Sequence, residues 1–479
     1  MKNWLTKNFS MREDIIITFL NSLIVMGGVF SLNGLIARFH GLETLGEFLL
    51  LKRTFFTAVS LFLFGSNLGL TNYISKNDDR TYGDAALHLF LVFSLPFIAG
   101  IIIGLQWSQI EGINKDVFWP YYLFALGICL QILAYSLFRG YLNMIGASVV
   151  QLVGTAVIPI ILFLLLDDLM EIFTWVGISS IGIMLFGFVW RNNGIRILKV
   201  NIVYYVDLVI YGLNRIPSII AQFILLAGLP IMIAKTSNLE NVAYFNSSLS
   251  LLNLSLLITH PIGMVLLPRI SRKLARGKID EISYGLKLAL YGGIYFSMMF
   301  GIWIFIFAPI ILELWLGQIG NIGSLILRGI IISLPFYTIA GLARSPIDAA
   351  SYKGYNSIIY GIAGMFVVAL YYLGIKLGYH PLYVAVTSFV GGQIIAGLSS
   401  IIVLNKFFDI RIWNPTLIRD VIIGIFLVIS GYYIMLNLGL NRLIIACSIF
   451  ILGIATFNYY YKNTKGGWVY DFRKLIKQI

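Results

Sequence analysis

The chain has 479 residues, of which 59% are hydrophobic and 11% charged, with a net charge of +13 and a mean hydropathy of +0.89. About a quarter of the residues of a soluble domain are charged, so this composition excludes an ordinary globular protein and predicts an integral membrane protein. Its basic residues are dispersed over short loops and its two cysteines fall inside apolar runs, which excludes a nucleic-acid-binding patch, a disulfide framework and a cysteine metal cluster.

Apolar runs recur along the whole chain, each near the roughly 20 residues that a helix needs to cross the hydrocarbon. They predict an all-α polytopic membrane protein with about 14 transmembrane helices. The expected spans are 14–37, 46–73, 84–106, 117–138, 146–166, 171–190, 212–234, 242–265, 286–308, 322–343, 355–374, 380–404, 418–436 and 440–460.

Lys and Arg predict the orientation, because they stay preferentially on the cytoplasmic side. With the N-terminus inside, the outside connections keep few basic residues and include the acidic turn Asp167, Asp168 and Glu171. An even number of spans then leaves both termini cytoplasmic. The first apolar run is too long for a cleavable signal peptide and is expected to be the targeting signal.

A sequence repeat organises the chain. The stretch Ala37–Phe48, ARFHGLETLGEF, returns 197 positions later as Ala234–Phe245, AKTSNLENVAYF. Each copy predicts a two-helix hairpin with a short polar turn. Because six helices separate the copies, they enter the membrane in the same direction, which indicates a parallel repeat about an axis normal to the bilayer. The alternative is chance resemblance between two apolar segments.

The repeat predicts two six-helix lobes related by a pseudo-two-fold axis. The N-terminal lobe is expected at 1–190 and the C-terminal lobe at 212–404. A basic and then amphipathic cytoplasmic connection joins them at 191–211. The segment 405–479 holds two further helices and a basic tail.

Helix 2 carries Lys52 and Arg53, and Arg53, Thr57, Ser60 and Asn67 share one helix face by their spacing. We expect that face to look away from lipid. Helix 1 has no carboxylate in its middle.

In the second half, Arg215 lies at the start of helix 7 and Pro230 lies well inside it, which predicts a bend. Helix 8 carries a polar stripe of Asn246, Ser250, Asn253 and His260, and a break is expected at Pro261. A short interfacial helix is expected at 269–278.

Charges inside the hydrocarbon cost about 2.5 to 3.5 kcal/mol each, so they normally face a partner or an aqueous cavity. Arg53, Arg215 and Arg328, with Lys52 beside the first, therefore predict a cationic cavity between the lobes that suits an anionic group such as a pyrophosphate. The alternative is that Lys52 and Arg53 pair with Glu43 or Glu47, while Arg215 and Arg328 reach the interfaces.

The polar stripe of helix 8 also has two interpretations. Asn246, Ser250 and Asn253 could exchange hydrogen bonds with sugar hydroxyls, or they could make ordinary helix-to-helix contacts.

Enzymatic chemistry has little support in this sequence. It contains no G-x-x-x-x-G-K-[ST] phosphate loop, and its connections are short. We therefore expect a protein that is not an enzyme and that has no cofactor and no metal site.

The hairpin Ala37-Arg38-x-x-Gly41 through Gly46 and Phe48 to Gly69-Leu70, the segment at Tyr244 and the exit Pro268-x-Ile270-Ser271 resemble the O-antigen and polysaccharide flippases. Those belong to the multidrug/oligosaccharidyl-lipid/polysaccharide exporter superfamily. The resemblance implies a protein of the bacterial inner membrane that moves an undecaprenyl-diphosphate-linked oligosaccharide to the outer leaflet by alternating access.

The resemblance also implies the partners: the lipid-linked oligosaccharide, membrane lipids and polysaccharide assembly proteins such as a polymerase and a chain-length regulator. The basic position carried over from it is Arg53. Two alternatives within the superfamily stay open, a flippase for the peptidoglycan lipid precursor and a cation-coupled drug antiporter. A membrane scaffold is a third, from another class.

Overall fold

The structure is a computed structural model of the whole chain. It describes residues 11–107, 117–192, 194, 201–213, 215–254, 279–317, 321–350, 354–409 and 415–437, with the single residues 448 and 451. The predicted span at 440–460, the helix expected at 269–278, His260 and Pro261, and the basic tail after 461 lie outside these residues, apart from 448 and 451.

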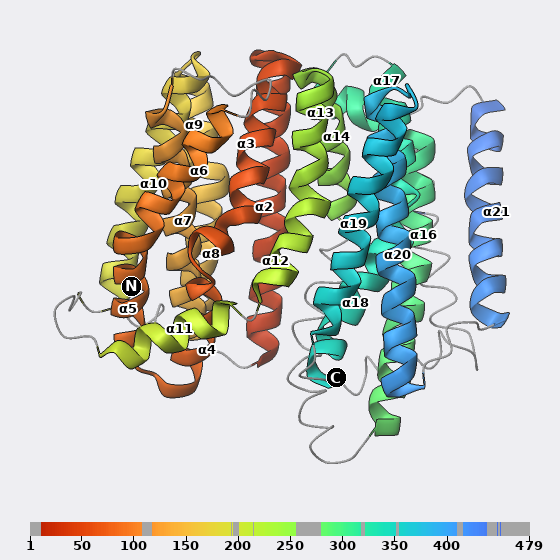
Figure 1. Cartoon of the computed structure of the whole chain (residues 1–479). Helices are drawn as coiled ribbons and strands as arrows, with labels where there is room; N and C mark the ends of the chain where they lie inside the picture. The colour runs from red at the N-terminus through yellow and green to blue at the C-terminus, as the bar shows by residue number, and fades with distance from the viewer. Residues whose placement is uncertain are drawn as a thin grey trace. The chain divides into compact units, whose positions relative to one another are not determined.

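Within the described ranges the backbone is helical, joined by short turns (Figure 1). Among the described residues, nine helices are long and apolar enough to cross a membrane, or eleven if each of two bent pairs of helices counts as one span. Helices satisfy every internal backbone group, which is why apolar runs of this length adopt them in lipid. The predicted class, an all-α polytopic membrane protein, is confirmed.

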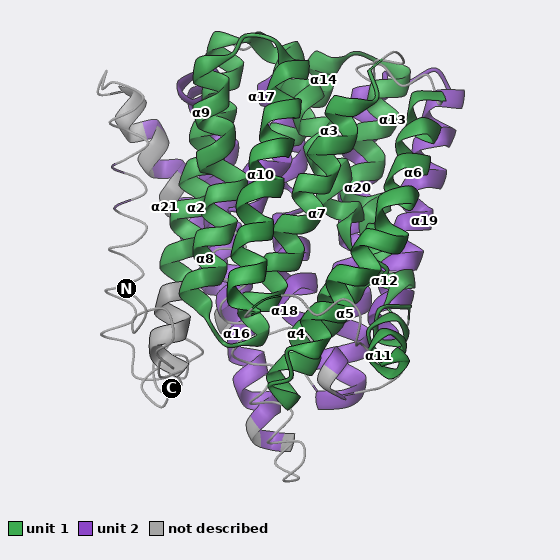
Figure 2. Cartoon of the chain, turned by 90° about the vertical axis from the view of Figure 1, so that its left-hand side faces the viewer, with its two compact units in different colours: residues 1–247 green, residues 248–479 purple. Residues whose placement is uncertain are grey.

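The chain divides into two compact units, 1–247 and 248–479 (Figure 2). The helices of unit 1 are α2 (Met11–Phe39), α3 (Gly41–Phe62), α4 (Ser66–Asn77), α5 (Thr81–Leu89), α6 (Leu95–Trp107), α7 (Trp119–Gly140), α8 (Met144–Leu152), α9 (Ile158–Leu165), α10 (Leu169–Arg191), α11 (Ile202–Leu213), α12 (Ile216–Phe223), α13 (Leu229–Thr236) and most of α14 (Leu239–Asn253).

Three π-helical turns complete spans in the described part of unit 1. They are η1 (Phe90–Ser94), η2 (Val153–Val157) and η4 (Ile224–Gly228), and each joins two α-helices into one span. Such turns are frequent at functional sites because they leave backbone carbonyls outside the regular hydrogen-bond ladder.

Unit 2 holds α16 (Ile279–Leu316), α17 (Asn321–Ile331), α18 (Leu334–Ala350), α19 (Tyr355–Lys376), α20 (Pro381–Phe408) and α21 (Pro415–Asn437). Its helix α20 packs on both α18 and α19. Small residues allow these close approaches: a side chain at Gly397 would meet the backbone of Phe336, and one at Gly374 would meet Val384.

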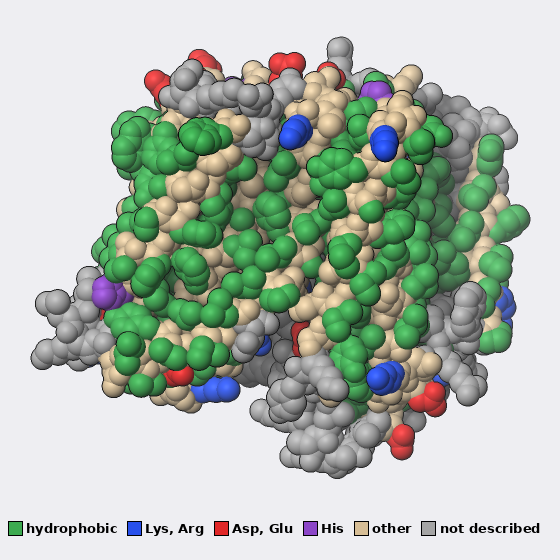
Figure 3. Space-filling view, in the orientation of Figure 1, with side chains coloured by type: hydrophobic (Ala, Val, Ile, Leu, Met, Phe, Trp, Pro, Cys, Tyr) green, Lys and Arg blue, Asp and Glu red, His purple; other side chains and the backbone are tan. Residues whose placement is uncertain are grey.

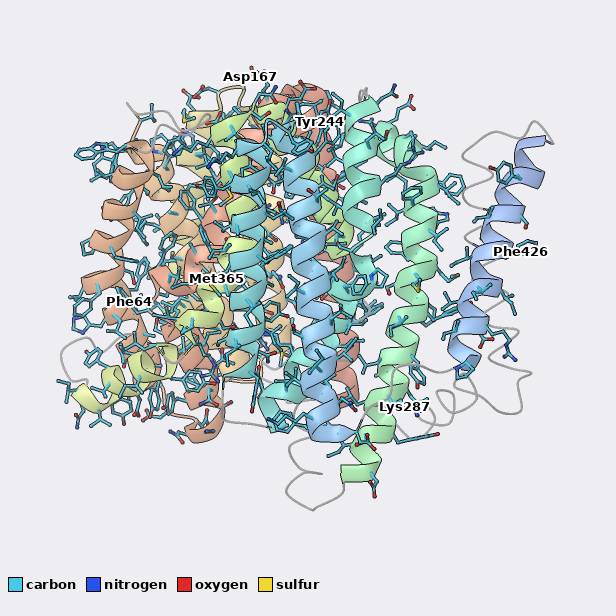
Figure 4. The ribbon with its side chains drawn as sticks, turned by 45° about the vertical axis from the view of Figure 1, so that its right-hand side comes forward. Phe64, Asp167, Tyr244, Lys287, Met365 and Phe426 are labelled. Atoms are coloured by element: carbon cyan, nitrogen blue, oxygen red, sulfur yellow. The ribbon has the colours of Figure 1, made fainter. Side chains whose placement is uncertain are left out.

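Helix 2 of the prediction is broken. Its halves α3 and α4 meet at an angle of 58°, and the three residues between them include Phe64 and Gly65, both with positive φ (51° and 69°). Phe64, labelled in Figure 4, packs on Phe97 at 5.2 Å between ring centroids. A side chain at Gly65 would collide with the backbone of Gly212, so glycine is required here for space as well as for conformation.

Helix 7 of the prediction is one span from Ile216 to Thr236, made of α12 and α13 with η4 between them. The π turn ends at Gly228, two residues before Pro230, and so loosens the hydrogen-bond ladder where the proline cannot donate. The bend expected at Pro230 stays a prediction.

The two copies of the repeat touch inside unit 1. A side chain at Gly46 of α3 would collide with the carbonyl oxygen of Leu239 and lie 3.4 Å from the backbone nitrogen of Ala243 in α14. Gly46 and Ala243 are equivalent positions in the repeat, 197 residues apart. The hairpin copies thus approach each other through matching small residues.

Candidate functional site

The adjacent cations of α3 point into different surroundings. Arg53 is half-buried, and its Nη2 donates a hydrogen bond of 3.4 Å to the backbone carbonyl of Asn246 in α14. Because successive residues of a helix lie about 100° apart, Lys52 faces another side of α3. Arg53 and Asn246 are thus two predicted site residues that the structure brings together.

Lys52 reaches into the interior of unit 1. Its Nζ donates a hydrogen bond of 3.4 Å to the carbonyl of Thr155 in the π turn η2 and lies 5.1 Å from the centre of the Phe48 ring. It lines a cavity of about 10 Å³ together with Gln131 and Gly154. That volume is near the smallest that admits one water molecule.

Gln131 is the second polar group of this cavity. It is 2% exposed, and its Nε2 has no hydrogen-bond partner among the described residues. Glu47, one of the two glutamates that the alternative offered as partners, accepts a hydrogen bond of 3.3 Å from the hydroxyl of Tyr121 in α7. The ammonium of Lys52 is therefore held by a backbone carbonyl and an aromatic ring.

Arg215 makes local contacts at the junction of α11 and α12. It is exposed, its Nη1 donates to the carbonyl of Tyr211 at 3.2 Å, and its guanidinium lies 3.8 Å from the centre of the Tyr211 ring. This stacking satisfies the charge without a carboxylate.

Arg328 belongs to unit 2. Its Nε donates to the carbonyl of Phe305 at 3.0 Å, and its guanidinium lies 5.5 Å from the centre of that ring. It shares a face of α17 with the exposed side chain of Leu325, three residues earlier. Nothing in these contacts brings Arg328 to the other predicted site residues.

The stripe on α14 is partly engaged in helix packing. Asn246 is fully buried, Ser250 and Asn253 are half-buried, and the Oδ1 of Asn253 accepts a hydrogen bond of 2.7 Å from the hydroxyl of Tyr337 in α18. Asn253 therefore acts as a helix-to-helix contact in this conformation.

Polar groups at the break in helix 2 were not singled out from the sequence as a site. Ser66 is 1% exposed and Asn67 5% exposed, and Asn67 Nδ2 donates 3.1 Å across the break to Ser60 Oγ. Ser66 Oγ and Asn67 Oδ1 have no partner among the described residues. The signal that could have revealed the break is Gly65-Ser66-Asn67, a glycine followed by residues that favour helix starts.

Metal chemistry finds no support in the part of the chain that the structure describes, since no three His, Cys, Asp or Glu side chains gather there. The described fold is that of a polytopic membrane protein whose spans carry basic side chains. The comparisons with solved structures agree with this class.

The lipid II flippase MurJ in its inward closed conformation is similar over 93% of this chain and 99% of its own, at 15% identity and a TM-score of 0.68. A MATE multidrug resistance transporter of the MOP superfamily, facing inward, covers 81% of this chain and 96% of its own, at 14% identity and a TM-score of 0.63. A MOP superfamily transporter from Pyrococcus furiosus, described as having a binding pocket of reverse polarity, matches at 14% identity and a TM-score of 0.57, over 84% of this chain and 96% of its own.

No family model and no curated protein matches the sequence. At these identities the solved structures establish a shared fold, the one common to flippases and multidrug transporters of the MOP superfamily.

Proposed function

We propose that this protein moves an undecaprenyl-diphosphate-linked oligosaccharide, the repeat unit of an O-antigen or capsule, from the cytoplasmic to the outer leaflet of a bacterial inner membrane. Both termini would be cytoplasmic. The lobes 1–190 and 212–404, joined by the connection 191–211, would open a cationic cavity alternately to the two sides of the membrane. The segment 405–479 would add two helices and a basic tail.

Physical chemistry supports this proposal. A diphosphate and a hydrophilic glycan cannot cross hydrocarbon unaided, whereas a polyprenyl tail can stay in lipid. A basic site that is open to the membrane is the machinery that such a substrate needs.

Arg53 is the observation that carries the proposal. It is a half-buried guanidinium in a membrane span, and its Nη2 donates to the backbone carbonyl of Asn246 at 3.4 Å. A guanidinium has five N–H donors, which can form strong, charge-assisted bonds to phosphate oxygens. In the proposal Lys52, Arg215, Arg328, Asn246, Ser250 and Asn253 complete the substrate site.

The second candidate is a flippase for the peptidoglycan lipid precursor. It is favoured by the similarity to the lipid II flippase MurJ over almost the full length of both chains. A cation-coupled drug antiporter is disfavoured, because it would need a membrane-embedded carboxylate for ion coupling. Helix α2 has no Asp or Glu from Ile15 to its end at Phe39.

Reconstitution with three substrates separates these functions. The purified protein in liposomes receives, in separate arms, a fluorescent undecaprenyl-diphosphate oligosaccharide, fluorescent lipid II and a cationic dye. We expect flipping of the first and no transport of the dye. Flipping of lipid II alone would establish the second candidate, and dye transport alone would overturn both.

Substitution of Arg53 tests the site itself. Arg53→Ala should lower the flipping rate at least about tenfold, since a hydrogen bond to a charged group contributes about 1.5 to 3 kcal/mol. The matched control is Arg38→Ala, which removes an exposed arginine at the end of α2 and should keep the wild-type rate. Equal rates for both variants would show that Arg53 does not bind the substrate.

A further inference from the structure

Helix α11 lies across the end of unit 1. In Figure 1 it lies crosswise to the spans, beside the lower ends of α4 and α5. It packs on both of these helices. One side of α11 is therefore attached to the transmembrane part of unit 1, at the level where the spans end.

The attached side is polar and aromatic. The hydroxyl of Tyr204 donates to Asp79 Oδ2 at 2.8 Å, and the hydroxyl of Tyr82 donates to Asp207 Oδ2 at 2.9 Å. A third hydrogen bond of 2.6 Å joins the hydroxyl of Tyr205 to His88 Nδ1. These three bonds fix the rotation of α11 about its own axis.

Leu208 and Gly212 fix the distance of α11 from its neighbours. Leu208 is fully buried against Gly69, and Gly212 lies on Gly65 at the break of helix 2. The helix is therefore positioned by packing as well as by hydrogen bonds.

The opposite side of α11 is apolar and bare. Its large side chains are 45% to 72% exposed and recur at spacings of one, three, four and three residues, which places them along one stripe. They are Ile202, Val203, Val206, Ile210 and Leu213. No charged side chain belongs to this stripe, because Asp207 points to the attached side.

The apolar stripe is continuous with the lipid-facing surface of the spans. Leu91, Val92 and Phe93 of η1, the turn that follows α5, are 42% to 55% exposed. Figure 3 shows hydrophobic side chains covering this part of unit 1 down to its lower edge, with basic and acidic side chains at that edge. The stripe thus lies at the transition from hydrocarbon to water.

Two stacked arginines flank α11 in the sequence. Arg191, which ends α10, stacks on Tyr141 at 4.0 Å, and Arg215, which follows α11, stacks on Tyr211 at 3.8 Å. Stacked guanidinium groups keep free N–H donors, which suit lipid phosphates.

We propose that α11 is an interfacial helix, with its apolar stripe inserted at the boundary between headgroups and acyl chains and its polar side clamping α4 and α5. The partner is the lipid surface, which a helix with one apolar and one polar side fits. Through Gly212 and Gly65 the membrane surface then holds the broken end of helix 2. This inference concerns unit 1 and does not require the proposed substrate.

Spin labels in lipid nanodiscs test the proposal directly. In the full-length chain with Cys129 and Cys447 replaced by Ala, single labels are placed at Val206 and at Ile210. Phe93, on the lipid-facing surface, and Asn77, exposed at the end of α4, serve as reference positions. Collision with oxygen reports lipid, and collision with a water-soluble nickel complex reports water.

We expect the labels on α11 to collide with oxygen and to be shielded from nickel, at a depth between those of Phe93 and Asn77. Nickel accessibility equal to that of Asn77 would overturn the proposal, because the stripe would then face water. Shielding from both reagents would also overturn it, because protein and not lipid would then cover the stripe.

Hydrogen exchange of α11 provides a second test that does not depend on transport. Placing carboxylates in the stripe, with Val206→Asp and Ile210→Asp together, should expel it from the interface and speed exchange of its amides in nanodiscs at least about tenfold. The matched control, Val206→Leu with Ile210→Leu, should exchange as the wild type does. Equal exchange in the two double variants would contradict the proposal.

Discussion

Lys52 and Arg53 are adjacent in the sequence but point in different directions from α3. Their adjacency suggested one basic patch. The side chain of Lys52 ends on a π-turn carbonyl within unit 1, whereas that of Arg53 ends on the backbone of α14. Only the fold decides which of two neighbouring cations faces which element.

The surroundings of Lys52 make a prediction about stability. Its ammonium has one long hydrogen bond to a carbonyl and an aromatic ring beside it, which offset little of the cost of removing a charge from water. Lys52→Met should therefore raise the free energy of unfolding by about 1 kcal/mol. Thermal unfolding in detergent measures this. Lys52→Arg keeps the charge and should show no gain, and a loss of stability in the Met variant would mean that the ammonium stabilises the fold.

At the scale of elements, the break between α3 and α4 depends on Gly65. This residue has φ of +69° and faces the backbone of Gly212, whereas Gly41 has φ of +90° with no atom near the position of a Cβ. A left-handed conformation costs alanine about 1 kcal/mol, so Gly41→Ala should lower the free energy of unfolding by that amount alone. Gly65→Ala should lower it by about 3 kcal/mol, because the new methyl group also overpacks against Gly212. Similar unfolding temperatures for the two variants would show that the backbone at Gly212 can move to accommodate the methyl group at little cost in stability.

The attachment of α11 should weaken in acid. Burial alone would raise the pKa of Asp79, but hydrogen bonds from the Thr81 hydroxyl, the Thr81 amide and the Tyr204 hydroxyl outweigh it and lower the pKa. A carboxyl whose pKa is lowered by folding contributes stability above its unfolded value, near pH 4, and loses that contribution as the pH falls through its folded value.

A spin label at Val206 should therefore become more mobile as the pH falls below about 4. Asp79→Asn should remove this response and leave the label mobile at neutral pH. The same response in Asp79→Asn as in the wild type would assign it to other groups. Asp167→Asn, in the exposed turn after α9, is a control that should behave as the wild type does.

Periodicity and span length predicted most of the transmembrane helices, because apolar runs have one stable backbone solution in lipid. They did not reveal the break of helix 2, since apolar residues continue on both sides of Gly65-Ser66-Asn67. Nor did they predict that Pro230 would follow a π turn within a continuous span. The amphipathic character of the connection was visible in the sequence, whereas the tyrosine and aspartate bonds that dock it depend on side chains from α5 and from the turn before it.

At the scale of the whole molecule, the distribution of Lys and Arg predicts the orientation in the membrane. In the predicted topology the end of α4 is cytoplasmic and the turn at Asp167 is outside. In a chain without native cysteines, Asp167→Cys should react with an impermeant maleimide in intact cells, and Asn77→Cys only after the membrane is opened. The reverse labelling pattern would show that the topology is inverted. Labelling of both cysteines in intact cells would show that the predicted number of spans between positions 77 and 167 is wrong.

For the predicted site, the sequence indicated which residues to consider but not what they contact. Charges in apolar runs are conspicuous, so Arg53, Arg215 and Arg328 stood out. Their contacts are a carbonyl of α14, a tyrosine on the preceding helix and a phenylalanine of α16. Each comes from a different element, and no pattern within one helix encodes such contacts.

The meeting of Gly46 with Leu239 and Ala243 bears on how the chain arose. If one ancestral hairpin was copied, equivalent positions of the two copies came to lie near each other. A methyl group at 46 would meet the carbonyl oxygen of Leu239, whatever residue stands at 243. Gly46→Ala should therefore be poorly tolerated even when Ala243→Gly removes the methyl group at the equivalent position.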